Sequence, residues 1–399
     1  MKQELEIYIH IPFCVKKCNY CDFLSFPCSS EVHDVYVKKL MEELIYRSVW
    51  CREYSVSSVF IGGGTPSSIH ERYIADILET LNKYYYTRPD MEITIECNPA
   101  SVMRHKFSTY KKAGVNRLSI GLQSADNAEL RMLGRIHSFE EFLKAYQSAR
   151  MEGFDNINVD LIDCIPMQSL KTWKKTLRNV LMLKPEHVSV YNLIVEEGTP
   201  FYEMQQKGLL IMPSEDEQSA IDLFTKECMD KYGYKRYEFS NYSRPGRECR
   251  HNKGYWTGVP YIGFGIGAAS SFAGVRWNNI RDIQKYLALD MKNTDGPDPD
   301  LKSLAEPVDE ADILLRTDIQ KLSRTDRMEE YMYLGMRLTE GVSAEDFRRE
   351  FGAGIEEIFG EPLKKHAATG LIIKDGERYR LSDRGIDLSN IVLSDFLLH

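Results

Sequence analysis

The sequence has no long apolar run. A membrane-spanning helix requires about 18 apolar residues in a row, and no run comes near that length. Its first residues, MKQELEIYIH, lack the order of basic, apolar and small residues that marks a secretory signal. Positive charge is not in excess either, because 51 Lys and Arg face 59 Asp and Glu, for a net charge of −8. Such a balance gives no general attraction to nucleic acid. These absences predict a cytoplasmic globular protein.

The length and composition predict a substantial hydrophobic core. The chain has 399 residues, of which 43% are hydrophobic, enough for one large domain and a smaller one. There is no low-complexity tract, and no internal repeat beyond an alternation of strand and helix patterns. The patterns that can indicate function are therefore local motifs.

The strongest local motif is a cluster of cysteines. Of nine cysteines, Cys14, Cys18 and Cys21 lie together in the stretch CVKKCNYCDF, and clustered thiols in a reducing compartment are more often metal ligands than disulfides. Thiolates select zinc, copper or iron-sulfur clusters. A closed zinc site needs a fourth ligand, and no Cys or His follows at the usual short spacing. The motif favours a four-iron cluster with one open iron over zinc, and either over three unliganded thiols.

Six short runs rich in β-branched and aromatic residues predict strands, with helical patterns between them. Because strands that alternate with helices form right-handed crossovers, they predict a parallel sheet, and six units predict a partial (β/α)6 barrel. We expect apolar residues on both faces of this sheet. The runs are EIYIHIPF (6–13), SVFIGG (58–63), EITIEC (92–97), RLSIGLQ (117–123), INVDLID (157–163) and HVSVYNLIV (187–195).

Polar or special residues stand where these predicted strands end. The carboxyl ends of parallel strands meet at one rim, which is where barrels of this kind carry their chemistry. Each residue taken alone is more readily explained as a solvated loop residue or a helix cap. Their shared position favours a common site. They are Cys14, the segment GGGTPS (62–67), Glu96, Asn98, Gln123, Asp160 and Asp163.

The rest of the chain has a different pattern. Aromatic and glycine-rich runs after Glu196 predict further strands or loops that close the open side of the sheet. Residues 1–290 would then form the barrel with its strand extension. The composition of NTDGPDPD predicts a linker over 291–300. Residues 301–399 are expected to form a small winged-helix-like α+β domain, with a hairpin turn at Asp375 and Gly376.

The motif C-x-x-x-C-x-x-C after a first strand, in a partial barrel, resembles the radical S-adenosylmethionine (SAM) superfamily. This resemblance implies that Cys14, Cys18 and Cys21 bind a 4Fe-4S cluster whose open iron is chelated by the amino and carboxylate groups of SAM. Electron transfer from such a cluster cleaves SAM to a 5′-deoxyadenosyl radical.

Further motifs narrow the resemblance and cover nearly the whole chain. The stretches YIHIPFC, CNYCDF, GGGTPS, IECNP, NRLSIGLQS and GFGIGAAS are similar to the family of oxygen-independent coproporphyrinogen III oxidases. True oxidases carry one more cysteine, where this chain has Phe23. Phe23 and the pattern H-N-x-x-Y-W, here His251 to Trp256, resemble instead the haem-chaperone (HemW) branch. That branch implies a protein that binds haem and transfers it to an acceptor haemoprotein; the alternative is an oxidase that decarboxylates coproporphyrinogen propionates to give protoporphyrinogen IX.

The family resemblance also implies which residues contact each cofactor. The loop at Gly62, Gly63 and Gly64 would let backbone approach SAM, since glycine has no Cβ. His10 would support the cysteine loop. Positions that match SAM contacts are Tyr8, Tyr20, Gly64, Thr65, Glu96, Gln123, Arg135 and Asp160, and those assigned to haem are His251, Asn252, Tyr255 and Trp256.

The residues around His251 allow two interpretations. A neutral imidazole is a suitable axial ligand for haem iron, and Arg247 and Arg250 could pair with haem propionates. Alternatively, RECRHNKGYW is a strand or loop whose His and aromatic side chains are satisfied in the core. Without the resemblance, the second interpretation would be favoured.

The expected partners follow from the resemblance. They are haem, an acceptor haemoprotein, an electron donor such as flavodoxin or ferredoxin, and acceptors at a membrane surface. A third hypothesis, a radical enzyme or binding protein that acts on RNA, is disfavoured by the acidic charge balance. The winged-helix-like domain is therefore expected to cover the mouth of the barrel or to meet the acceptor, rather than to bind nucleic acid.

Overall fold

The structure is a computed structural model and describes residues 2–291 and 304–398. Six parallel strands form its centre, each next to the following one in the sequence. All six predicted strands are present. They are β1 (Gln3–Ile11), β2 (Tyr54–Gly63), β3 (Thr87–Cys97), β4 (Arg117–Gln123), β5 (Ile157–Asp163) and β6 (His187–Asn192).

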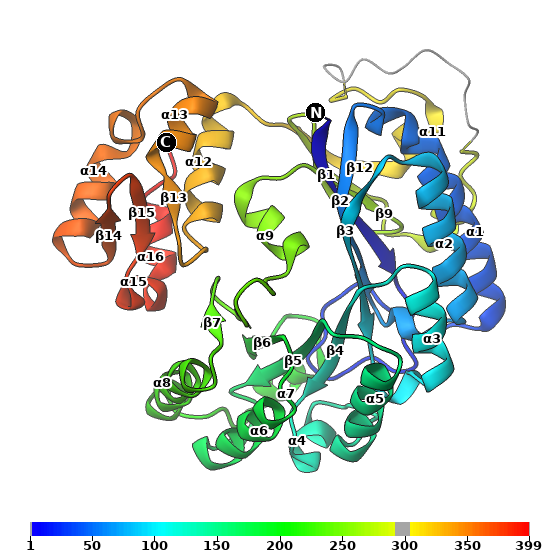
Figure 1. Cartoon of the computed structure of the whole chain (residues 1–399), viewed down its shortest axis with the longest axis horizontal. Coiled ribbons are helices and arrows are strands. Elements are labelled where there is room, and N and C mark those ends of the chain that lie inside the picture. Colours follow the sequence, from blue (N-terminus) through cyan, green and yellow to red (C-terminus); the bar gives the residue numbers. More distant parts are fainter. Residues whose placement is uncertain (1, 292–303, 399) are drawn as a thin grey trace.

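Helices cover the convex side of the curved sheet (Figure 1). Their starts follow local rules, as in α5, where Ser138 and Glu141 form a reciprocal capping box. The helices that connect the parallel strands are α1 (Ser30–Arg47), α2 (Glu71–Tyr84), α3 (Arg104–Lys112), α4 (Asn127–Met132), α5 (Phe139–Met151) and α6 (Leu170–Met182), and α7 (Pro200–Gln206) and α8 (Glu215–Lys231) follow β6.

The two faces of the sheet differ in polarity, and the expectation of apolar residues on both faces is wrong. In β1, Leu5, Ile7 and Ile9 are fully buried in the main core under the helices. The alternate residues, such as Glu6 and Tyr8, point to the concave side, because side chains alternate along a strand. Glu96 of β3 and Asp160 of β5 also point to the concave side, so the sheet encloses a polar interior.

Additional strands lengthen the sheet at both edges. Within the described residues the sheet has 12 strands, in the order β12-β11-β10-β9-β1-β2-β3-β4-β5-β6-β8-β7. The prediction that the later segments close the open side is therefore wrong, because they extend the edges at β1 and β6. These strands are β7 (Lys235–Arg236), β8 (Asn241–Ser243), β9 (Tyr261–Phe264), β10 (Ala269–Phe272), β11 (Val275–Asn279) and β12 (Arg316–Lys321).

The C-terminal unit has its own core and a three-stranded antiparallel sheet. Its hairpin turns at Asp375 and Gly376, as the sequence predicts, and Gly376 has a φ of +58°. The elements, in a winged-helix-like order, are α12 (Arg324–Gly335), β13 (Val342–Ser343), α13 (Ala344–Phe351), α14 (Ile355–Ala368), β14 (Ile372–Asp375), β15 (Arg378–Leu381), α15 (Asp383–Asp387) and α16 (Ser389–Ser394).

The pairing of strands indicates where the first unit ends and the C-terminal unit begins. The expected linker, residues 291–300, lies almost wholly outside the described residues. Strand β12 pairs with β11, and α11 (Glu310–Leu315) leads directly into β12. We therefore propose that the first unit extends to Lys321 and that the C-terminal unit starts at Leu322.

Two short helices complete the first unit. Helix α10 (Ile283–Leu287) packs against α1, and α9 (Arg250–Thr257) lies between the concave side of the sheet and the C-terminal unit (Figure 1). Among the helices in 2–291 and 304–398, none has the length and apolar character to cross a membrane.

Candidate cluster and cofactor site

The cysteine loop follows β1 directly and is anchored at several points. Cys14 donates its backbone N–H to the carbonyl of Phe26, at 3.1 Å. Asn19, between the second and third cysteines, donates from its side chain to the carbonyl of Met132 at 2.8 Å, which ties the loop to the end of α4. Cys14, Cys18 and Cys21 are partly exposed thiols. The loop thus presents three thiols on a fixed backbone.

The glycine loop at the end of β2 packs against the cysteine loop. The N–H groups of Gly64 and Thr65 donate to the carbonyls of Ile11 and Phe13, both at 2.8 Å, and the Thr65 hydroxyl lies 3.4 Å from the Cys14 sulfur. A Cβ on Gly64 would lie 2.8 Å from the Phe13 carbonyl oxygen. Glycine is required here for contact between the two loops.

Glu96 and Asp160 project into the polar interior from β3 and β5. The Glu96 carboxylate accepts the N–H of Gly63 at 3.1 Å, and burial, together with the negative charge of Asp160, raises the pKa of Glu96 to about 8. Asp160 accepts from Ser119 at 2.9 Å and from Asn158 at 2.8 Å, while burial raises its pKa. Glu96 is therefore largely protonated at neutral pH and can donate a hydrogen bond.

Arg135 comes from the loop between α4 and α5 and joins this group. It donates from Nη2 to the Gly121 carbonyl at 2.8 Å, and its Nη1 lies 3.6 Å from the sulfur of Cys18. Gln123 lies beside it, with a φ of +72° at the end of β4. A Cβ on Gly121 would come within 3.0 Å of Gln123 Nε2. Tyr20 is close by as well, and its burial raises its pKa.

His10 has both ring nitrogens in hydrogen bonds. Nδ1 lies 3.0 Å from the Tyr8 hydroxyl, and Nε2 lies 2.9 Å from the carbonyl oxygen of Leu24, after the cysteine loop. Burial lowers the pKa of His10, so the ring is neutral. These contacts agree with the expectation that His10 supports the loop.

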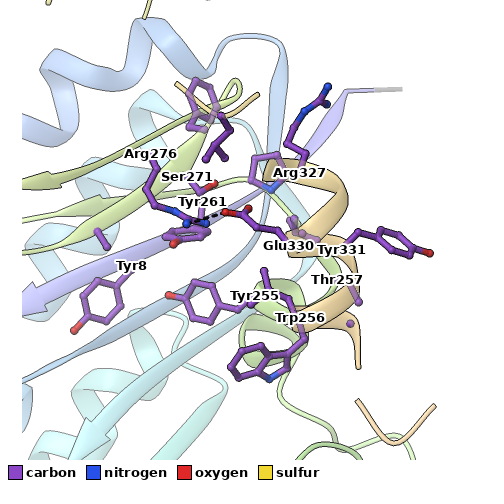
Figure 2. A pocket seen from close by; sticks show the side chains of 18 of the residues that line it. Tyr8, Tyr255, Trp256, Thr257, Tyr261, Ser271, Arg276, Arg327, Glu330 and Tyr331 are labelled. Atoms are coloured by element: carbon purple, nitrogen blue, oxygen red, sulfur yellow. Dashed lines mark ion pairs between the residues drawn. The ribbon is translucent and has the colours of Figure 1, made fainter. Parts of the chain in front are cut away.

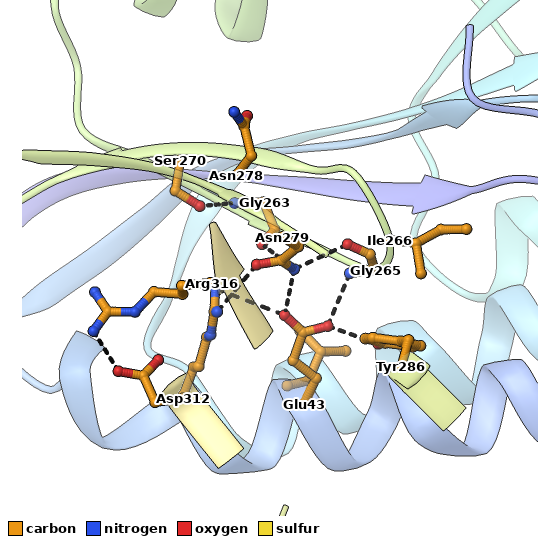
Figure 3. A network of polar contacts seen from close by, with 12 residues as sticks. Glu43, Gly263, Gly265, Ile266, Ser270, Asn278, Asn279, Tyr286, Asp312 and Arg316 are labelled. Carbon is orange, nitrogen blue, oxygen red and sulfur yellow. Dashed lines mark hydrogen bonds and ion pairs between the residues drawn. The ribbon is translucent and has the colours of Figure 1, made fainter. Parts of the chain in front are cut away.

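A buried polar network holds the turn after β9 next to the end of β1 (Figure 3). The fully buried carboxylate of Glu43 accepts from Gly265 N–H at 2.8 Å, from Asn279 Nδ2 at 2.8 Å and from the Tyr286 hydroxyl at 2.7 Å. A Cβ on Gly265 would lie 2.8 Å from the His10 carbonyl oxygen. The glycines of GFGIG thus allow the turn to pack on the strand that carries the cysteine loop.

Two rim residues have structural roles. Asn98 accepts the N–H of Ala100 at 3.0 Å and so caps a short 3-10 helix, Pro99–Ser101. Asp163 is buried, which raises its pKa to about 6, and its backbone carbonyl accepts from Leu193. Neither belongs to the group around the cysteine loop.

His251 is satisfied in the core, as the second interpretation holds, but its segment is a helix, α9, and not a strand or loop. His251 is 2% exposed. Its Nδ1 lies 2.8 Å from the Ser58 hydroxyl and its Nε2 lies 2.9 Å from the Tyr255 hydroxyl, and burial lowers its pKa to about 3. In this conformation neither ring nitrogen of His251 is available to iron.

The other residues of this motif contact different parts of the molecule. Asn252 donates to the Tyr237 hydroxyl at 3.1 Å. The Trp256 ring packs against the Arg337 guanidinium of the C-terminal unit, 4.5 Å from the ring centre. Arg247 and Arg250 lie near Asp155 and Asp90, at 3.9 and 3.2 Å, and neither is among the described residues that line the large cavity.

A cavity of about 1140 Å³ opens between the first strands and the C-terminal unit. Tyr8 reaches it from β1, and Tyr255 and Trp256 reach it from α9 (Figure 2). Phe23 of the cysteine loop also lines it. Ligand cavities of roughly 300–1,000 Å³ are usual for small molecules, so this one has room for a large planar ligand. Phe23 is 68% exposed.

Several cavity residues carry no local sequence signal and were missed. Arg276 of β11 makes an ion pair with Glu330 of α12 at 2.8 Å, across the boundary between the two units (Figure 2). Arg281 and Arg327 also line the cavity. These residues are brought together by the tertiary structure alone.

The residues around the cysteine loop fit an iron-sulfur cluster and a polar cofactor. The donors are soft thiols, Arg135 places positive charge beside one of them, and its buried Nε has no hydrogen-bond partner among the described residues. Such an orphaned donor is expected to find a partner when a ligand binds. In the described ranges, no three side chains from His, Cys, Asp and Glu converge closely enough to hold a single metal ion.

Comparison with known families defines the class of protein. Residues 8–180 match the model of the radical SAM superfamily, and residues 322–388 match the HemN C-terminal domain. The solved structure of coproporphyrinogen III oxidase (HemN) from Escherichia coli superposes with a TM-score of 0.82 over 99% of this chain and 90% of that chain, at 22% identity. That likeness shows the fold: a partial radical SAM barrel with a small C-terminal domain.

Full-length relatives define the family more closely. The chain is 34% identical to the heme chaperone HemW of Bacillus subtilis, over 98% of both proteins. It is 32% identical to the heme chaperone HemW of Lactococcus lactis, over 98% of this chain and 97% of that one. The chain therefore belongs to the HemW family of radical SAM proteins. Membership of the superfamily implies a 4Fe-4S cluster and SAM as cofactors.

Proposed function

We propose that this chain is a haem chaperone, which binds haem and transfers it to an acceptor haemoprotein. Its named relatives are heme chaperones over their full length. The observation that carries the proposal is the cavity of about 1140 Å³ beside the cysteine loop, lined by Tyr8, Phe23, Tyr255 and Trp256. Aromatic walls and this volume suit a tetrapyrrole.

Cys14, Cys18 and Cys21 are proposed to hold the 4Fe-4S cluster, with SAM on its open iron. When bound, the cluster supplies one-electron reduction of SAM. The chain's own residues prepare the place: protonated Glu96 can donate to a hydroxyl, and Arg135 offers its unpartnered Nε to an anionic group.

Other SAM contacts are proposed at the same rim, on residues that surround this pair. Asp160 lies beside Glu96 in the interior, and Gln123 lies beside Arg135. Tyr8 and Tyr20 are expected to pack against the cofactor, while Gly64 and Thr65 fix the glycine loop against the cysteines.

The proposed cellular setting is the cytoplasm. All nine cysteines lie in the described part of the chain and are free thiols, which suits a reducing compartment such as the cytoplasm. An electron donor such as flavodoxin or ferredoxin and an acceptor haemoprotein, at a membrane surface for some acceptors, complete the proposed set of partners.

The oxidase alternative is less supported. Where oxidases of the wider family carry a further cysteine, this chain has Phe23, an exposed wall of the cavity. The relatives from Bacillus subtilis and Lactococcus lactis, which match over nearly their full length, are named heme chaperones.

The proposed function is tested by haem titration of the anaerobically reconstituted protein, with and without SAM, while 5′-deoxyadenosine is measured. We expect saturation at one haem per chain. The variant in which Cys14, Cys18 and Cys21 are all replaced by Ala should lose the iron of the cluster. A protein that holds no iron-sulfur cluster, or that shows no saturable haem binding, would refute the proposal.

A further inference from the structure

Tyr255 is the residue that His251 contacts on the side of the cavity. His251 is held between Ser58 and Tyr255, and its Nδ1 also lies 3.7 Å from the carboxylate of Glu6. A helix places residues four apart on one face, so His251 and Tyr255 lie next to each other on α9. His251 packs against Ser58 of the sheet, and its Nε2 contacts the hydroxyl of Tyr255. The histidine is thus behind the tyrosine, as seen from the cavity.

Tyr255 is half-buried and reaches the cavity wall. Figure 2 shows its ring projecting from α9 toward Tyr8, into the space between the first strands and the C-terminal unit. The ring packs edge-on against Tyr261, with centroids 4.7 Å apart. The hydroxyl therefore has a fixed position, set by ring contacts with Tyr261 and His251 and by one hydrogen bond to His251.

Arginines and acidic side chains line the cavity in equal number, and most of them pair with one another. Arg281 and Arg327 both line it, and neither forms an ion pair within the part of the chain that the structure describes. Arg276 and Arg349, by contrast, are paired with Glu330 and Asp346 at 2.8 and 2.5 Å. Arg281 and Arg327 are thus the arginines of the lining that remain to pair with acidic groups of a ligand, and Arg327 also interacts electrostatically with Glu350.

We propose that ferric haem binds in this cavity with the phenol oxygen of Tyr255 as its axial ligand, and that His251 is a positioning residue for that oxygen. The inference rests on the proposed haem-binding function and names the ligand within it. Tyrosine is an established axial ligand of ferric haem. On binding, the O–H bond of the phenol breaks, an O–Fe bond forms, the proton is released to water, and the iron stays ferric.

The test is optical, EPR and resonance Raman spectroscopy of the full-length protein titrated with ferric haem. We expect a high-spin spectrum with a phenolate-to-iron charge-transfer band in the wild type. Tyr255→Phe should lose that band and weaken haem binding at least tenfold. Tyr331→Phe is the matched control, because Tyr331 also lines the cavity but donates its hydroxyl to the Ser343 carbonyl; it should keep the band.

His251→Gln tests the positioning role. Because glutamine can still form a hydrogen bond, the variant should bind haem and keep the phenolate band, but at a shifted energy. An unshifted band would show that His251 does not position the phenol oxygen of Tyr255.

Two outcomes separate this inference from the proposed function. If the wild type binds one haem but the spectrum is that of a histidine or thiolate ligand, or if Tyr8→Phe instead of Tyr255→Phe abolishes the phenolate band, the ligand assignment is wrong and the chaperone proposal stands. If the wild type does not bind haem saturably, both fall.

Discussion

A guanidinium nitrogen of Arg135, Nη1, lies 3.6 Å from the sulfur of Cys18. The two residues are far apart in the sequence, and they meet because Asn19 anchors the cysteine loop to the end of α4. Positive charge beside a cluster ligand stabilises the reduced form of the cluster, which carries more negative charge.

Arg135→Gln should therefore lower the reduction potential of the reconstituted cluster, by tens of millivolts as an order of magnitude, while the iron content stays close to that of the wild type. Arg131→Gln, on the exposed side of α4, is the control and should leave the potential unchanged. An EPR-monitored redox titration measures both. Equal potentials for Arg135→Gln and the wild type would exclude this role.

Gly254 is expected to be required for the packing of α9 on β1. A Cβ at this position would overlap the carboxylate of Glu6. Gly254→Ala should lower the free energy of unfolding by about 1–3 kcal/mol, as overpacking does. Gly360→Ala in α14 meets no atom within 4 Å and should be neutral or stabilise by up to about 1 kcal/mol. Urea unfolding compares the two; equal stabilities would contradict the packing.

Glu6 should make stability depend on pH. Burial raises the pKa of Glu6 from 4.5 to about 9, so between these values the folded state keeps a proton that the unfolded state loses. Stability from this group is therefore lost as pH rises through that window, at most about 1.4 kcal/mol per pH unit.

Glu6→Gln removes this titration, so the stability of the variant relative to the wild type should increase from about pH 6 to about pH 8. Glu4→Gln, two residues earlier on the same strand and partly exposed, is the control and should show no such trend. Urea unfolding at both pH values provides the measurement. A difference between Glu6→Gln and the wild type that stays constant would mean that Glu6 is ionised in the fold.

The unpaired arginines of the cavity should recognise the propionates of haem. Arg281→Gln and Arg327→Gln are each expected to weaken haem binding about tenfold, the loss usual for a hydrogen bond to a charged group. Haem dimethyl ester, which lacks the carboxylates, should bind these variants and the wild type equally. Arg349→Gln serves as a control, because Arg349 is already paired with Asp346; if it weakens binding as much as the other two, the assignment is wrong.

The sequence predicted the parallel strands and the rim on which Cys14, Glu96, Gln123 and Asp160 meet, because strand patterns are local and parallel strands end at one edge. The polar interior was signalled too, by the alternation in ELEIYIHI, where Glu6 and Tyr8 separate Leu5, Ile7 and Ile9. Tyr8 and His10 make this run resemble a continuously apolar one, which is why the sequence predicts apolar residues on both faces.

Other features depend on tertiary contacts and could not be predicted from local patterns. Helix α9 contains a glycine and few good helix formers, and its first N–H groups are satisfied by Glu92 of β3, at 3.2 and 3.3 Å. The cavity brings Arg276, Arg281 and Arg327 together from separate segments. Strand β12 belongs to the large sheet, although it follows residues that the structure does not describe. The proposed boundary is therefore at Leu322 and not at residue 301.

A haem chaperone carries haem and does not synthesise its precursor. The most direct measurement incubates the reduced, reconstituted protein anaerobically with SAM and coproporphyrinogen III, and analyses the tetrapyrroles by chromatography. We expect coproporphyrinogen to be recovered unchanged from a preparation that binds one haem per chain. Formation of protoporphyrinogen IX would contradict it.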